Sequence, residues 1–140
     1  MDNNLTFHFA VDGTDFTSAG QASVALKKNL RQLGIAPEII RRASIAMYEG
    51  EINMVIHAGG GDADVLVSEK DITITLTDHG PGIQDIEKAM QEGYSTAPDN
   101  VRSLGFGAGM GLPNMKRYSD SMDIKSAEGK GTTITLCINL

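Results

Sequence analysis

Five stretches of the chain alternate hydrophobic and polar residues, which is the pattern of half-buried β-strands. We predict strands at about 5–11, 63–69, 71–77, 121–127 and 132–139. One residue separates the second strand from the third, and the sequence Glu-Gly-Lys-Gly joins the last two. We therefore expect each of these two pairs to form a hairpin.

Apolar residues recur at helical spacing in four other stretches. The predicted helices cover residues 18–33, 37–58, 84–92 and 113–120. Gly34 suits the end of the first helix, and Pro37 suits the first turn of the second. The second helix is long and apolar on more than one face, so we expect it to be central and packed on both sides until Gly59 ends it.

The order of these elements predicts an α/β (α+β) two-layer sandwich, in which a mixed, mainly antiparallel sheet carries the helices on one face. Strands that come in pairs are unlike the strict strand–helix alternation of a doubly wound sheet. A length of 140 residues predicts that residues 1–140 form a single domain.

Composition narrows the class of protein. The formal net charge is −6 and the basic residues form no stripe, which disfavours binding to nucleic acid or anionic lipid. No apolar run approaches the ~20 residues that cross a bilayer, and the start of the chain lacks signal-peptide features, so we expect a cytoplasmic protein. Cys137 is the single cysteine, which excludes an internal disulfide, and its strand-like surroundings predict that it is buried.

Glycine is in excess, and its positions are informative. Twelve of the 16 glycines fall in four clusters, at 59–61, 80–82, 93–111 and 129–131. Glycine in a flexible linker would instead be spread out and accompanied by serine and proline. We therefore interpret these clusters as placed for a structural or functional purpose.

A polar stripe on the second predicted helix is the first candidate site. Glu49, Asn53 and His57 follow one another at four-residue intervals and so share one helix face. Ala46 and Gly50 flank the stripe, and their small size would leave room for a ligand. Taken alone, such a stripe is also typical of a solvated helix face.

The second candidate is the segment Asp78-His79-Gly80-Pro81-Gly82, directly after a predicted strand. Glycines let the backbone turn sharply and approach a flat ligand. A carboxylate at the end of a strand can accept a hydrogen bond from an exocyclic amine. The same segment is also compatible with a simple turn.

Glycine at every second position from Gly105 to Gly111 forms the third candidate. Backbone amides of such a loop can bind phosphate at the start of a helix, although a flexible loop without a ligand has the same composition. The segment matches neither the dinucleotide-binding fingerprint nor the P-loop. The fourth candidate, Gly129-Lys130-Gly131-Thr132, is by itself an ordinary hairpin turn.

Together and in this order, the four segments resemble the motifs of the GHKL (Bergerat-fold) ATPase superfamily. These motifs are an N box E-x-x-x-N, a G1 box D-x-G-x-G, a G2 box G-x-G-x-G and a closing G-T. From about residue 5 onward, the chain is similar to the small anti-sigma-factor and switch-protein serine kinases of bacteria (RsbT, RsbW and SpoIIAB types). Residues 78–96 look most like the RsbT type.

The resemblance implies a role for each matching residue. Glu49 would be the general base, and Asn53 would bind the Mg²⁺ that bridges the phosphates of ATP. Asp78 would accept the amino hydrogen of adenine, while Gly80 and Gly82 would let the purine lie close.

The resemblance also assigns the remaining motif glycines. Gly107, Gly109 and Gly111 would contact the phosphates, and Thr132 would lie near the adenine. The segment 95–108 is longer than the compact lid of the RsbT type. His57 matches no motif position, so we expect it to pack structurally.

The implied activity is transfer of phosphate from ATP to a serine or threonine of a small antagonist (STAS-domain) protein in a partner-switching pathway. A second hypothesis is a regulator that holds ADP or ATP and sequesters a sigma factor or activates a phosphatase. A third is a member that binds no nucleotide. Members of the family commonly dimerise, so the resemblance also implies a homodimer.

Overall fold

The computed structural model describes residues 4–13, 20–82, 90, 111–127 and 129–140. Within these residues, five strands form one sheet in the order β1-β2-β3-β5-β4. The strands are β1 (Leu5–Asp12), β2 (Gly60–Val67), β3 (Asp71–Asp78), β4 (Ser121–Ala127) and β5 (Gly131–Asn139). The helices are α1 (Gln21–Gln32), α2 (Pro37–Ala58) and α5 (Gly111–Arg117).

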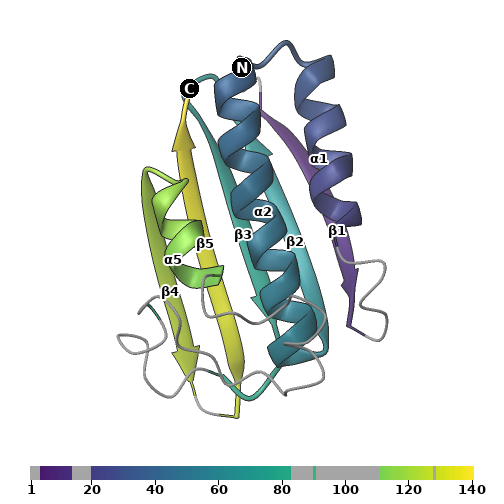
Figure 1. The fold of residues 1–140 in the computed structure, drawn as a ribbon, viewed down its shortest axis with the longest axis vertical. Coiled ribbons are helices and arrows are strands. Elements are labelled where there is room, and N and C mark those ends of the chain that lie inside the picture. The colour runs from purple at the N-terminus through teal and green to yellow at the C-terminus, as the bar shows by residue number, and fades with distance from the viewer. Residues whose placement is uncertain (1–3, 14–19, 83–89, 91–110, 128) are drawn as a thin grey trace.

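The predicted fold class is confirmed, with one refinement. The helices cover one face of the sheet, as expected for a two-layer sandwich (Figure 1). All four strand pairings between described residues are antiparallel, so this part of the sheet has no parallel component. Both predicted hairpin pairings are present, β2 with β3 and β4 with β5.

Element boundaries differ from the prediction mainly at glycines. β2 begins at Gly60 instead of 63, and α5 begins at Gly111 instead of 113, because glycine adds nothing to a hydrophobic pattern. α5 ends at Arg117 instead of 120. The Ser119 hydroxyl donates a hydrogen bond to the Met115 carbonyl at 2.8 Å, which satisfies a backbone acceptor at the helix end. The predicted helix 84–92 and the segment 95–108 lie outside the described residues, apart from Met90.

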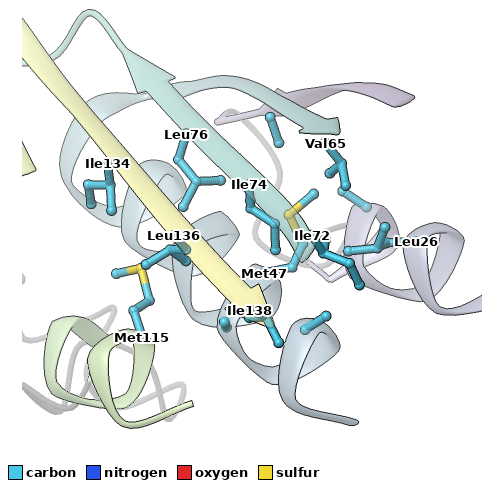
Figure 2. Packing of buried hydrophobic residues seen from close by; sticks show 14 of the residues in the cluster. Leu26, Met47, Val65, Ile72, Ile74, Leu76, Met115, Ile134, Leu136 and Ile138 are labelled. Atoms are coloured by element: carbon cyan, nitrogen blue, oxygen red, sulfur yellow. The ribbon is translucent and has the colours of Figure 1, made fainter. Parts of the chain in front are cut away.

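The core lies between the sheet and the helices, with α2 between α1 and α5 (Figure 1). The prediction that this helix is central is therefore confirmed. Fully buried side chains from both layers meet there, including Leu26, Met47, Ile72, Ile74 and Leu136 (Figure 2). Burial of each such side chain contributes about 1.5–3 kcal/mol of hydrophobic free energy.

Gly50 makes room for the sheet and not for a ligand, which corrects the expectation from the sequence. A Cβ added at Gly50 would overlap the side chain of Leu76 on β3. Ala46, one turn earlier, is fully buried. These small residues therefore allow close packing of α2 on the sheet.

Cys137 is partly exposed, so the prediction that it is buried was wrong. Its neighbours Leu136 and Ile138 are both fully buried. Since successive side chains of a strand point to opposite faces, Cys137 lies on the face of the sheet that the described helices leave open.

Candidate functional site

The C-terminal ends of α2 and β3 meet the N-terminal end of β5 at one end of the molecule (Figure 1). α2 begins with Pro37 and ends at Gly59, which adopts a left-handed conformation with φ of 71°. The predicted polar stripe of Glu49, Asn53 and His57 lies on the C-terminal half of this helix, and each of the three residues is partly buried.

Glu49 is linked to the short helix α5. Asn114 Nδ2 donates a hydrogen bond of 3.2 Å to Glu49 Oε1. A Cβ added at Gly111 would lie 3.9 Å from Glu49 Oε2, so this oxygen faces the start of α5. Burial raises the pKa of the Glu49 carboxyl, and the hydrogen bond from Asn114 acts in the opposite direction. A raised pKa brings a carboxylate closer to the range that suits a general base at neutral pH.

Asp78 lies at the end of β3 with 8% of its surface exposed. Its Oδ1 accepts hydrogen bonds from the backbone N–H of Gly80 at 3.0 Å and of Thr132 at 3.2 Å. Asp78 and Thr132 are directly paired across β3 and β5. The Thr132 hydroxyl lies 2.9 Å from the Ser126 hydroxyl of β4. The strand pairing therefore fixes the carboxylate and the threonine relative to each other.

The segment 80–82 packs against the end of α2 and against the β4–β5 hairpin. A Cβ at Gly80 would lie 2.6 Å from Ala58 Cβ, so only glycine fits this close approach. Gly82 has φ of 82° and packs against the carbonyl of Ala127. The Gly129 N–H donates a hydrogen bond of 2.8 Å to the Pro81 carbonyl. The second and fourth predicted motifs, which are far apart in the chain, thus form one structural unit.

His57, which matches no motif, lies close enough to Asp78 for the two to interact. Burial lowers the pKa of the imidazole, and the negative charge of Asp78 partly opposes that shift. The expectation that His57 packs structurally agrees with its partial burial.

The predicted site residues that the structure describes make their contacts in two groups. Glu49 and Gly111 are neighbours, and Asp78 contacts Gly80 and Thr132. The predicted phosphate-binding residues Gly107 and Gly109 lie outside the described residues, so their roles stay predictions.

Two polar residues of this region carry no motif signal in the sequence. Asn114 contacts Glu49 across 65 positions of the chain, which no local pattern reveals. Glu51 is only 2% exposed although it is a carboxylate. In the sequence, Glu51 lies near the apolar residues Met47 and Ile52 of the predicted helix 37–58. This position is the one sequence feature that indicates a buried carboxylate.

Glu51 caps the N-terminus of α1, which has no side-chain cap of its own. Its Oε2 accepts hydrogen bonds from the N–H groups of Gly20 at 3.0 Å and Ala22 at 3.1 Å, and its Oε1 accepts one from Ser23 at 2.6 Å. Three backbone donors and the positive end of the helix dipole compensate for the burial of this charge.

Residues 34–140 match the model of the family described as histidine kinase-, DNA gyrase B- and HSP90-like ATPase. The chain therefore belongs to this ATPase family, which confirms the resemblance found in the sequence. Curated relatives include the anti-sigma F factors of several clostridia. That of Clostridium novyi (strain NT) is 36% identical over 121 residues, which cover 82% of this chain and 81% of the relative. That of Clostridium perfringens (strain SM101 / Type A) is 30% identical, with 97% and 96% covered.

Two solved structures share the fold at low sequence identity. The RsbU and RsbW domains of a Mycobacterium tuberculosis protein align with a TM-score of 0.66 at 18% identity, over 96% of this chain and 32% of that chain. This chain thus spans about a third of that structure. The mycobacterial sensor histidine kinase MprB aligns with a TM-score of 0.55 at 16% identity, over 96% and 97% of the two chains.

None of the helices in the part of the chain that the structure describes is both long enough and apolar enough to cross a membrane.

Proposed function

We propose that residues 1–140 form one ATP-dependent protein serine/threonine kinase domain and anti-sigma regulatory factor. It would phosphorylate a small antagonist (STAS-domain) protein of a partner-switching pathway in the bacterial cytoplasm. The observation that carries the proposal is the partly buried Glu49 carboxylate, whose Oε2 faces Gly111 at the end of the G2 box. The family match and the names of the curated relatives support it.

Asp78 is suited to recognise adenine. Among the residues that the structure describes, both hydrogen bonds to its carboxylate go to Oδ1, which leaves Oδ2 for the exocyclic amine of the base. Thr132 is directly paired with Asp78 on the neighbouring strand. A charge-assisted hydrogen bond of this kind contributes roughly 1.5–3 kcal/mol.

Asn53 is suited to bind Mg²⁺. Its amide oxygen belongs to the class of ligand that this ion prefers, and it lies one turn from Glu49 on the same stripe. When bound with ATP, the ion would neutralise charge on the phosphates. Gly107, Gly109 and Gly111 would supply backbone N–H groups to the same phosphates.

Glu49 would act on the acceptor protein. A bond forms between the serine or threonine oxygen and the γ-phosphorus, and the bond from that phosphorus to the β–γ bridging oxygen breaks, which releases ADP. The hydroxyl proton passes to the Glu49 carboxylate. Burial of that carboxylate, which raises its pKa, makes it a better proton acceptor than an exposed glutamate.

Our first prediction tests this role. With Mg-ATP and a STAS-domain acceptor, Glu49→Gln lowers the rate of phosphate transfer by at least about 100-fold, because a general base contributes 10²–10⁴-fold. Transfer is measured with γ-labelled ATP, and the modified residue is identified by mass spectrometry.

Glu38→Gln provides the matched control on the same helix. Glu38 is exposed and forms an ion pair with Arg41 on the first turns of α2, so this variant retains the wild-type rate. Undiminished transfer by Glu49→Gln would exclude Glu49 as the base, and modification of a residue other than serine or threonine would exclude the proposed specificity.

Sequestration of a sigma factor is the second candidate function, which the names of the relatives favour. We expect an immobilised chain to retain a sigma factor more strongly with ATP or ADP than without nucleotide. Retention of a phosphatase instead would indicate the activator role, and equal retention with and without nucleotide would exclude nucleotide control.

A further inference from the structure

Asn114 lies where it can control the orientation of Glu49. It follows Gly111 by three positions on α5, so the two residues share the helix face that looks toward Glu49. The buried side chains of Leu112 and Met115 hold α5 against the core. Within the described part of the chain, the Glu49 carboxylate accepts one side-chain hydrogen bond, which comes from Asn114 at 3.2 Å.

The side-chain amide of Asn114 has a defined orientation. Its Oδ1 accepts a hydrogen bond of 3.5 Å from Arg117 Nη1, one turn later on α5. Its Nδ2 is therefore directed to Glu49. An asparagine with Oδ1 and Nδ2 exchanged would bring two donors together at Arg117 and two acceptors together at Glu49.

A glutamate carboxylate left alone rotates broadly about its last side-chain torsion. The hydrogen bond at Oε1 restricts this rotation, and Oε2 then faces Gly111. We propose that Asn114 is a positioning residue, which holds Glu49 so that Oε2 is directed at the acceptor hydroxyl beside the phosphate-binding segment. This inference rests on the proposed kinase function, since it assumes that Glu49 is the base.

The test compares Asn114→Leu with Asn29→Leu in the full chain. Both variants replace a partly buried asparagine amide by a leucine side chain of similar size, but Asn29 lies on α1 away from the site. We expect Asn114→Leu to lower single-turnover phosphate transfer about tenfold, with ADP affinity within twofold of wild type. Asn29→Leu retains the wild-type rate.

A double-mutant cycle separates positioning from a structural effect. If Asn114 acts through Glu49, Asn114→Leu causes no further loss in a Glu49→Gln background. An equal loss in both backgrounds, or a transfer rate within twofold of wild type in the single variant, overturns the proposal.

A readout independent of kinase activity is the titration of the Glu49 carboxyl by carbon NMR. Loss of the donor raises the carboxyl pKa further, because the hydrogen bond favours the ionised form. If Asn114→Leu does not fold, Asn114→Ala removes the donor without adding a charge and shifts the titration in the same direction. If the wild-type chain transfers no phosphate, the kinase proposal is wrong. The titration then tests only the hydrogen bond between Asn114 and Glu49. An unchanged midpoint in the Asn114 variant overturns that bond, and a raised midpoint supports it.

Discussion

Three carboxylates near one end of the molecule differ because of what surrounds each of them. Glu51 is buried and accepts hydrogen bonds from three backbone N–H groups, so its role is to cap α1. Asp78 accepts two backbone N–H groups at a single oxygen. Glu49 accepts one side-chain amide and has its pKa raised by burial. The fewer its fixed partners, the more of a carboxylate is left for a ligand.

At the scale of single residues, Asp78→Asn tests the adenine site. Asparagine retains an oxygen for the N–H groups of Gly80 and Thr132, but it presents a donor to the amino group of adenine. We expect the affinity for ADP to fall by about 10–100-fold, the equivalent of roughly 1.5–3 kcal/mol. Titration calorimetry measures this affinity.

Asp123→Asn is the control for that measurement. Asp123 is exposed on β4, and its substitution leaves ADP affinity unchanged. Wild-type affinity in Asp78→Asn with intact fold would remove Asp78 from the nucleotide site.

At the scale of elements, three consecutive residues of α2 serve three different neighbours. Each step along a helix turns by about 100°, so Glu49, Gly50 and Glu51 point in different directions. Glu49 contacts α5, Gly50 lies against Leu76 of the sheet, and Glu51 caps α1. These three consecutive residues therefore hold α2, which would carry the general base, against α5, the sheet and α1.

The cap of α1 gives a stability prediction at this scale. In Glu51→Gln, one oxygen becomes an NH₂ group that faces backbone donors, and the favourable charge at the helix start is lost. We expect the free energy of unfolding to fall by about 2–3 kcal/mol, measured by urea denaturation.

Glu38→Gln again supplies the comparison, because it loses an exposed ion pair worth about 0–1 kcal/mol and one acidic side chain in the first turn of α2. A loss in Glu51→Gln no larger than in this control would mean that the cap contributes little to stability.

At the scale of the whole molecule, the sequence predicted the architecture well because its strands alternate cleanly and its helices are amphipathic. It also placed Glu49, Asp78 and Thr132 in the candidate site through their motifs. It could not predict that Gly50 faces Leu76, or that Asn114 reaches Glu49, because these contacts depend on how helices lie against each other and the sheet. It also missed the cap by Glu51, since no rule of local spacing links this residue to Gly20.

The hydrogen bond between Asp78 and Thr132 spans 54 positions of the chain and two adjacent strands. A nascent chain that has emerged from the ribosome only as far as β3 therefore has the carboxylate but not its partner. Since β5 must pair with β3 before the two meet, the proposed adenine site is complete only after β5 has joined the sheet. If ATP binds at this site as proposed, it stabilises only the finished fold and not the early intermediates.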